Sequence, residues 1–147
     1  MNIPVYVTIE EVKRVCRELN LRDWTQMEST GVTIEEAEKI LAELDTDGLP
    51  IELEEFRRGL EVELEHGMVF RNANVTNNHP LLTGMITLAH FHEMLDYYKR
   101  LEVAELEGDI YKALKAGNTG KLDKYHKKLL EARAELAVHE FENLPKK

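Results

Sequence analysis

Apolar residues recur every three or four positions along most of this chain, which is the spacing of one face of an α-helix. Two stretches, 8–19 and 33–44, each begin with Thr-x-x-Glu, the capping-box signal for a helix N-terminus. The same periodicity continues over 52–66, from about 80 to 106, and over 121–142. The pattern predicts an all-α fold of about five helices, and the capping boxes predict where two of them begin.

The segments 7–19 and 32–44 resemble each other, which fits either an internal duplication or two helices that share one start signal. The glycine-containing break at 116–120 predicts that the last two helices form a C-terminal αα-hairpin. The length of 147 residues predicts a single helical domain. Within it, 1–50 is a candidate N-terminal subdomain, and 51–147 is expected to form the core helical bundle.

The fourth expected helix carries a histidine in its apolar face. At 100° per residue, His90 lies between Ile86, Met94 and Tyr97, and Glu93 lies at the edge of that stripe. A buried imidazole needs a hydrogen-bonding or metal partner, because an unsatisfied buried polar group costs about 1–3 kcal/mol. The pattern therefore predicts a buried His90 joined to a carboxylate or a metal.

The preceding helix offers that partner. Glu63 and His66 stand in Glu-x-x-His order, the spacing by which di-iron carboxylate bundles present two ligands from one helix. With His90 and Glu93 they form a candidate site for zinc, iron or manganese, with Tyr97 or Tyr98 as an acid–base helper. The alternative is a hydrogen-bonded network without metal, in which Glu63 or Glu65 contacts His90 and His66 contacts Glu93.

The net charge of −9 is local. Residues 35–66 hold twelve acidic and three basic residues, so the rest of the chain is close to neutral. Six lysines oppose them between Lys112 and Lys128. The acidic balance and the few aromatic residues beside these lysines argue against nucleic-acid binding, and solvated helix faces are the simpler explanation. Binding of nucleic acid or a phosphate ligand by this lysine-rich hairpin stays open as an alternative.

Cysteine and hydropathy patterns indicate the compartment. The single cysteine, Cys16, excludes an internal disulfide and a thiolate-rich zinc site. We expect no signal peptide and no membrane span, because the first residues lack a basic segment followed by an apolar one and no apolar run is long enough. These features favour a cytoplasmic protein. As an interaction or structural module, it is expected to have a protein partner or to associate with itself.

Residues 54–105 carry three motifs together: EEFRRGLEVELEHG at 54–67, NVTNNHP at 74–80 and ITLAHFHEMLDYYKRLEVAE at 86–105. They resemble an uncharacterised family of bacteria and phages, a domain of unknown function with E-L-E-H-G, N-V-T and A-H-x-x-E-x-x-D-Y-Y motifs. The resemblance implies site positions at Glu63, Glu65, His66, His90 and Glu93. It also implies a bacterial cell or phage-infected host, with association with a virion as a further option, and it implies no activity.

Three function classes follow. The sequence favours a small acidic interaction or structural module, plausible for a phage, with a Glu/His cluster that is structural. The first alternative is a metal-dependent enzyme that uses Glu63, His66, His90 and Glu93, and the second is a nucleic-acid or phosphate binder. The absence of a nucleophile–base–orienter triad favours a protein that is not an enzyme.

Overall fold

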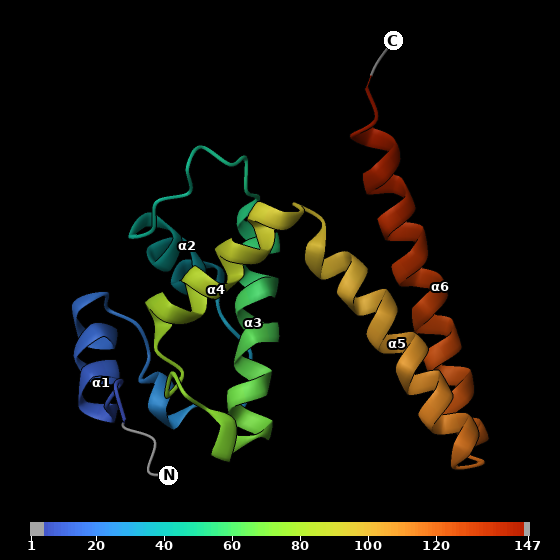
Figure 1. The fold of residues 1–147 in the computed structure, drawn as a ribbon, viewed down its shortest axis with the longest axis horizontal. Helices are drawn as coiled ribbons and strands as arrows, with labels where there is room; N and C mark the ends of the chain where they lie inside the picture. The colour runs from blue at the N-terminus through green and yellow to red at the C-terminus, as the bar shows by residue number, and fades with distance from the viewer. Residues whose placement is uncertain (1–4, 146–147) are drawn as a thin grey trace. The chain divides into compact units, whose positions relative to one another are not determined.

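A computed structural model describes residues 5–145 (Figure 1). Within that range it is entirely helical, with six α-helices and two short 3-10 helices. The elements are α1 (Ile9–Glu18), η1 (Trp24–Gln26), α2 (Ile34–Ala42), α3 (Leu53–Val69), η2 (Arg71–Ala73), α4 (Pro80–Glu93), α5 (Tyr97–Lys115) and α6 (Thr119–Glu142). The predicted all-α class is confirmed, and the predicted count of about five helices is too low by one.

The first two helices begin where the capping signals place them. The Thr8 hydroxyl accepts a hydrogen bond from the Glu11 amide, and the Thr33 hydroxyl accepts one from the Glu36 amide. At Thr33 the capping box is complete, because the Glu36 carboxylate accepts from the Thr33 amide at 3.1 Å. The first turn of each helix is therefore held by a hydrogen bond between residues three apart in sequence.

The next two helices have different boundary signals. The helix expected over 52–66 continues to Val69 as α3. The cap of α4 is His79, whose Nδ1 accepts from the Leu82 amide. Pro80 takes the first helical position, so the residue directly before it is the cap.

The helix expected from about 80 to 106 is in fact two helices. Met94 is extended, with φ −157° and ψ 132°, and ends α4, and Asp96 then opens α5. No glycine or proline marks this break, so the spacing of apolar residues predicts one continuous helix across it. The prediction that His90 and Tyr97 share one apolar helix face is therefore wrong, because the two residues lie on different helices.

The chain divides into two compact units, one ending at Leu95 and the other beginning at Asp96. In the first unit α3 packs against α2 and α4, and α1 packs against η1 and α4. The core of this unit includes Val12, Trp24, Ile40, Phe56 and Leu60. Residues 5–50 thus share one unit with α3 and α4.

The buried face of α4 is formed by Thr83, Gly84, Thr87, Leu88 and Phe91. A Cβ at Gly84 would lie 2.7 Å from Leu44 Cδ1 and 2.9 Å from Ile40 Cγ2, so a glycine allows the close approach of α4 to the α2 segment. Ile86 and Met94, expected on the buried face, are 39% and 47% exposed. His90 lies between these two faces and is only partly buried.

The second unit is an antiparallel pair of helices, α5 and α6, joined by a tight turn at Gly117 (Figure 1). Leu106, Leu129 and Ala132 are buried between the helices, and Val103, Ile110 and Tyr125 pack around them. Ion pairs join early α5 to late α6 at Arg100–Glu140 and join Glu107 to Arg133, both with 2.6 Å N–O distances. The antiparallel packing agrees with the predicted αα-hairpin.

Two further properties bear on the location and chemistry of the chain. Across residues 5–145, every helix is too short or too polar to cross a lipid bilayer. Cys16 lies inside the first unit with 2% of its surface exposed, and burial raises the pKa of its thiol. The thiol is therefore shielded in the folded state.

Candidate functional site

The structure brings together one pair of the predicted site residues. Glu63 on α3 lies 3.4 Å from His90 on α4, measured from Oε1 to Nε2, and the two side chains are 13% and 27% exposed. The carboxylate contacts the ring at Nε2 and so restricts the orientation of the imidazole. The pair thus links the C-terminal end of α4 to the middle of α3.

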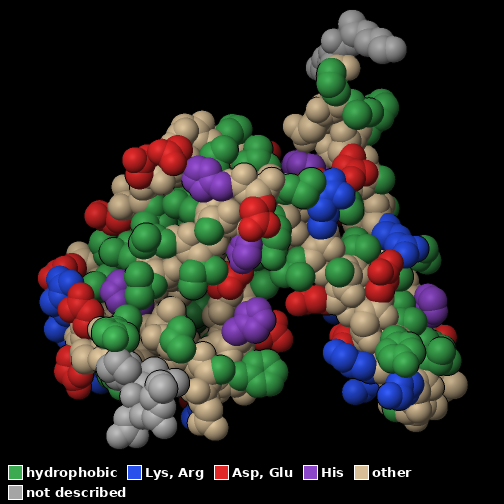
Figure 2. All heavy atoms as spheres, in the orientation of Figure 1, with side chains coloured by type: hydrophobic (Ala, Val, Ile, Leu, Met, Phe, Trp, Pro, Cys, Tyr) green, Lys and Arg blue, Asp and Glu red, His purple; other side chains and the backbone are tan. Residues whose placement is uncertain are grey.

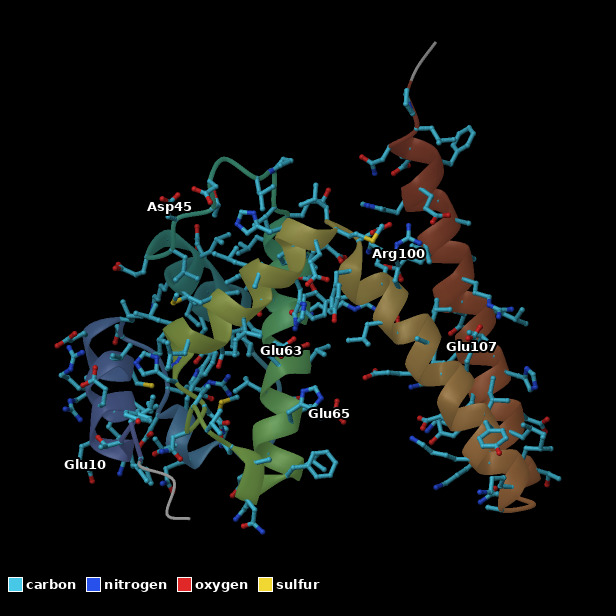
Figure 3. The ribbon with its side chains drawn as sticks, viewed as in Figure 1. Glu10, Asp45, Glu63, Glu65, Arg100 and Glu107 are labelled. Atoms are coloured by element: carbon cyan, nitrogen blue, oxygen red, sulfur yellow. The ribbon has the colours of Figure 1, made fainter. Side chains whose placement is uncertain are left out.

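The other predicted site residues on these two helices lie at the surface. His66, Glu65 and Glu93 are exposed, and Figure 3 shows Glu63 and Glu65 as separate side chains along α3. Among residues 5–145 there is no group of three or more His, Cys, Asp or Glu side chains that could hold a metal ion. The set Glu63, His66, His90 and Glu93 stays a prediction, of which the described structure assembles one pair.

The two tyrosines predicted as acid–base helpers belong to the second unit, at the start of α5. The rings of Tyr97 and Tyr98 meet edge to face, with centroids 5.2 Å apart and planes at 80°. This is a favoured geometry for an aromatic pair.

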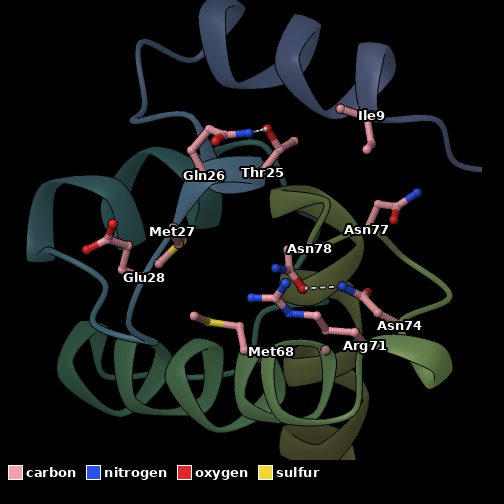
Figure 4. A pocket seen from close by; sticks show the side chains of 11 residues that line it. Ile9, Thr25, Gln26, Met27, Glu28, Met68, Arg71, Asn74, Asn77 and Asn78 are labelled. Carbon is pink, nitrogen blue, oxygen red and sulfur yellow. Dashed lines mark hydrogen bonds between the residues drawn. The ribbon is translucent and has the colours of Figure 1, made fainter.

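A hollow of the first unit lies in a different place. We call it the asparagine pocket, and its volume is about 520 Å³, within the usual range for small-ligand sites (Figure 4). It lies between η1, the end of α3 and the loop that precedes α4. Its lining residues are Ile9, Thr25, Gln26, Met27, Glu28, Gly67, Met68, Arg71, Asn74, Asn77 and Asn78.

A pair of side-chain amides forms one wall of the asparagine pocket. Asn74 Nδ2 donates to Asn78 Oδ1 at 2.9 Å, as the dashed line in Figure 4 shows. The pair packs directly on α3 at Gly67, where a Cβ would lie 2.4 Å from Asn78 Oδ1 and 2.9 Å from Asn74 Cγ. A residue with a side chain would have to displace these two amides, which gives a packing reason for a glycine at this helical position.

The loop that carries these amides contains two consecutive residues with left-handed backbone conformation. Asn77 and Asn78 both have positive φ, 49° and 59°, a conformation that asparagine adopts more readily than most residues. Asn77 Nδ2 donates to the Val7 carbonyl at 2.6 Å, which ties the loop to the segment before α1. The pocket is therefore held by contacts to both α3 and the N-terminal segment.

Several polar groups of the asparagine pocket have no hydrogen-bonding partner within the described part of the chain. They are the Asn78 amide NH₂, the Asn77 Oδ1 and the Arg71 guanidinium. Together they offer more donors than acceptors, and the carboxylate of Glu28 lies among the lining residues. The sequence predicted no site here, because residues 67–79 fall between two expected helices and show no helical periodicity. The asparagines of this segment were the available signal.

A buried carboxylate of the first unit, Glu36, forms an ion pair apart from the pocket. Burial raises the pKa of Glu36, but bonds from the Arg22 guanidinium, the Thr33 amide and the Trp24 indole outweigh it and lower that pKa to about 2. Arg22 Nη2 lies 2.6 Å from Glu36 Oε2, and Trp24 Nε1 donates to Oε1 at 3.3 Å. These bonds fasten η1 to α2 and so support the edge of the pocket.

The lysine-rich hairpin lies at the turn of the second unit. Figure 2 shows basic side chains gathered at that end, and all six lysines between Lys112 and Lys128 are exposed. Lys112 pairs with Asp109 at 3.1 Å, and Lys115 lies 5.8 Å from the centre of the Tyr111 ring. The proposed role in nucleic-acid or phosphate binding stays a prediction.

Comparison with known proteins gives one relationship. No curated protein and no solved structure matches the chain. A family described as "Protein of unknown function (DUF5661)" matches residues 12–107, which include the Glu63–His90 pair and every asparagine of the pocket. The match is wider than the 54–105 resemblance read from the motifs, because it also includes α2 and most of α1. By this match over most of its length, the chain belongs to the DUF5661 family.

Proposed function

We propose that this protein is a non-catalytic interaction module, and that its asparagine pocket binds an extended polypeptide segment. The observation that carries the proposal is the pair Asn74–Asn78 seated on Gly67, which directs side-chain amides into a hollow of about 520 Å³. Peptide groups present one donor and one acceptor each, and asparagine matches both. The proposal includes the bacterial or phage cytoplasmic setting that the sequence resemblance implies.

The lining chemistry supports binding more than catalysis. The eleven described residues that line the pocket include no histidine, cysteine or tyrosine, and they include one carboxylate, Glu28. Nucleophile, base and orienter are therefore not combined there. Met27 and Met68 supply flexible apolar surface, which suits the varied side chains of a bound peptide.

A peptide selection tests the proposal. Random dodecapeptides displayed on phage are selected on the immobilised full-length protein, with an excess of soluble Asn78→Gly variant as competitor. Glycine accepts the positive φ of this position, so the variant removes the amide without backbone strain. Binders that survive this competition depend on Asn78.

Binding of the selected peptides is then measured by fluorescence anisotropy. We expect Kd to rise at least about tenfold for Asn78→Gly and for Arg71→Ala, which corresponds to about 1.4 kcal/mol. Asn72→Ala is the matched control, because Asn72 is exposed on η2 and does not line the pocket. Failure to enrich any peptide over the competitor, or equal loss in the control, would overturn the proposal.

A metal-dependent enzyme is the second candidate, and the Glu63–His90 contact at 3.4 Å is the observation that favours it. The test is elemental analysis of protein purified without chelator. Stoichiometric zinc, iron or manganese that is lost in a His90→Gln variant would favour this candidate over the interaction module, because an amide is a poor ligand for these metals.

A further inference from the structure

We propose that His79 is a proton-sensitive cap of α4, which holds the first turn of the helix while its imidazole is neutral and releases it when the imidazole is protonated. Release also loosens the loop directly before His79, which carries the amides of the asparagine pocket. The proposal concerns the response of the fold to pH, and it does not depend on whether that pocket binds a peptide. It rests on the hydrogen bond at the cap, the burial of His79 and the charges that face it.

The hydrogen bond at the cap requires a neutral imidazole. The Leu82 amide donates to His79 Nδ1 at 3.4 Å. A ring nitrogen accepts a hydrogen bond only when it carries no proton, so the proton of neutral His79 lies on Nε2. Protonation places a second N–H on Nδ1, where it faces the N–H of Leu82. The bond is then lost, and two hydrogen-bond donors face each other.

The other three side-chain caps of α-helices in residues 5–145 do not depend on a proton in this way. The hydroxyls of Thr8 and Thr33 cap α1 and α2, and the amide of Asn118 caps α6. These residue types are preferred at the cap position, and none of them titrates near neutral pH. Histidine can act as an acceptor only above its pKa, so the start of α4 is the one that responds to mild acid.

Both the side chain and the backbone of His79 hold the start of α4. Pro80, at the first helical position, has no amide N–H. The Thr83 amide donates to the His79 carbonyl at 2.9 Å, and the Leu82 amide donates to the ring. The positive end of the helix dipole also lies here, so a charge on the imidazole is unfavourable for a second reason.

The surroundings of His79 oppose its protonation. The residue is 7% exposed, and burial lowers the pKa of its imidazole below the usual value of 6.5. Among the described residues, the charged groups that act on it are Glu11 and Arg14 of α1; α2 and α3, which also pack against α4, place none there. Arg14 already donates to both Glu11 oxygens, at 2.8 and 2.5 Å. The carboxylate is thus largely matched and compensates a charge on His79 only in part.

The loop before His79 shares the support of the cap. The His79 amide donates to the Thr76 carbonyl at 3.0 Å, which closes a turn over Asn77 and Asn78. Both asparagines have positive φ, so the turn depends on its fixed end at His79. Farther along, α4 is held by the buried Thr87 and other core residues. Release of the cap therefore loosens the turn and the first residues of α4 while the rest of the helix stays packed.

The direction of the pKa shift gives the pH range. Because the folded state holds its proton on His79 less tightly than the unfolded chain does, the unfolded chain takes up a proton first as the pH falls. The contribution of the cap to stability is therefore complete above about pH 6.5 and is lost progressively below it.

An NMR titration of the full-length protein from about pH 8 to about pH 5 tests the cap directly. We expect the ring nitrogen shifts to show neutral His79 with its proton on Nε2. The Leu82 amide shift should change with the same midpoint as the His79 ring, below pH 6.5. A neutral ring that carries its proton on Nδ1, or a Leu82 amide that does not follow the titration of His79, would overturn the proposal.

A variant with a permanent cap tests the effect on stability. Asparagine at position 79 accepts the same amide bond without titrating, so His79→Asn should keep the cap at all pH values of the titration. Urea unfolding is followed through the fluorescence of Trp24, which is buried in the same unit. From about pH 7.5 to about pH 5, the unfolding equilibrium constant of the wild type should rise at least about threefold relative to that of His79→Asn.

His92→Asn is the matched control. His92 lies near the other end of α4 and is 43% exposed, so its variant should keep the pH dependence of the wild type within about twofold. A wild type and a His79→Asn variant that lose stability in parallel would refute the proposal. So would a His92→Asn variant that removes the pH dependence as His79→Asn is expected to do.

Discussion

Replacing Gly67 with alanine tests whether the asparagine pair is as tightly seated as its geometry indicates. In an open helix this change stabilises by about 1 kcal/mol, because alanine is the better helix former. At Gly67 the added Cβ would lie 2.4 Å from Asn78 Oδ1 and 3.0 Å from Asn74 Nδ2. Overpacking of this kind costs about 1–3 kcal/mol, and loss of the Asn74–Asn78 bond about 1 kcal/mol more.

The expected net effect of Gly67→Ala is a destabilisation of the first unit by about 1–3 kcal/mol. Urea unfolding followed through Trp24, the single tryptophan of the chain and fully buried in that unit, measures it. The control is Gly108→Ala on α5, where a Cβ meets nothing within 4 Å, and its thermal unfolding by circular dichroism should show a gain of about 0.5–1 kcal/mol.

A second substitution isolates the contact. Asn78→Gly removes the nearest atom, so Gly67→Ala should cost less in an Asn78→Gly background than in the wild type, by about 1 kcal/mol. If Gly67→Ala stabilises the protein as Gly108→Ala does, or if the two changes are additive, then the amides do not pack on α3 as described.

The ion pair of Glu36 makes the stability of the first unit depend on pH. Because its pKa is lowered from 4.5 to about 2, the carboxylate contributes its full stabilisation above pH 4.5 and loses it as the pH falls toward 2. The urea midpoint of the wild type should therefore fall over that range, and the midpoint of Glu36→Gln should fall less. At pH 7 the same variant should lose about 1–3 kcal/mol, because Arg22 and the buried Trp24 indole lose a charged acceptor. His90→Ala should reduce stability by about 1–2 kcal/mol in thermal unfolding, because the His90 ring is partly buried against Glu63. His92 is 43% exposed, so His92→Ala should cost under about 0.5 kcal/mol. Equal effects of the two variants would contradict the placement of His90. The His90→Gln variant and a chelator together distinguish a metal site from a hydrogen bond at the Glu63–His90 pair. If a metal is bound, the variant and the chelator-treated wild type should have the same melting temperature. If a hydrogen bond holds the pair, the chelator should not change the melting temperature of the wild type.

Local signals in the sequence predicted local structure well. Thr8 and Thr33 placed two helix starts because a capping box needs only residues three apart. The break at Met94–Asp96 has no such signal, since none of the three residues there is a helix breaker. The helical rotation assumed for this segment therefore predicted His90 on the buried face of the helix. The structure instead buries Thr83, Thr87 and Phe91.

The candidate sites show the same limit. The sequence predicts that Glu63 reaches His90 either through a shared metal or directly, and the two side chains lie 3.4 Å apart. The asparagine pocket could not be read in this way, because its wall depends on loop residues returning to Gly67 on α3. This contact depends on the missing side chain of Gly67, whose space the two amides occupy. In the sequence the only sign of such a contact is a glycine inside a helix.

The burial of Cys16 makes the thiol a reporter of motion in the first unit. A thiol with 2% exposure and a raised pKa reacts with a disulfide reagent only when α1 swings away from η1 or when the whole unit unfolds. At low reagent concentration the labelling rate follows the population of open molecules, and at high concentration it reaches the opening rate itself. The chain thus carries a native probe, requiring no engineered label, for timing how often the helix beside the asparagine pocket detaches.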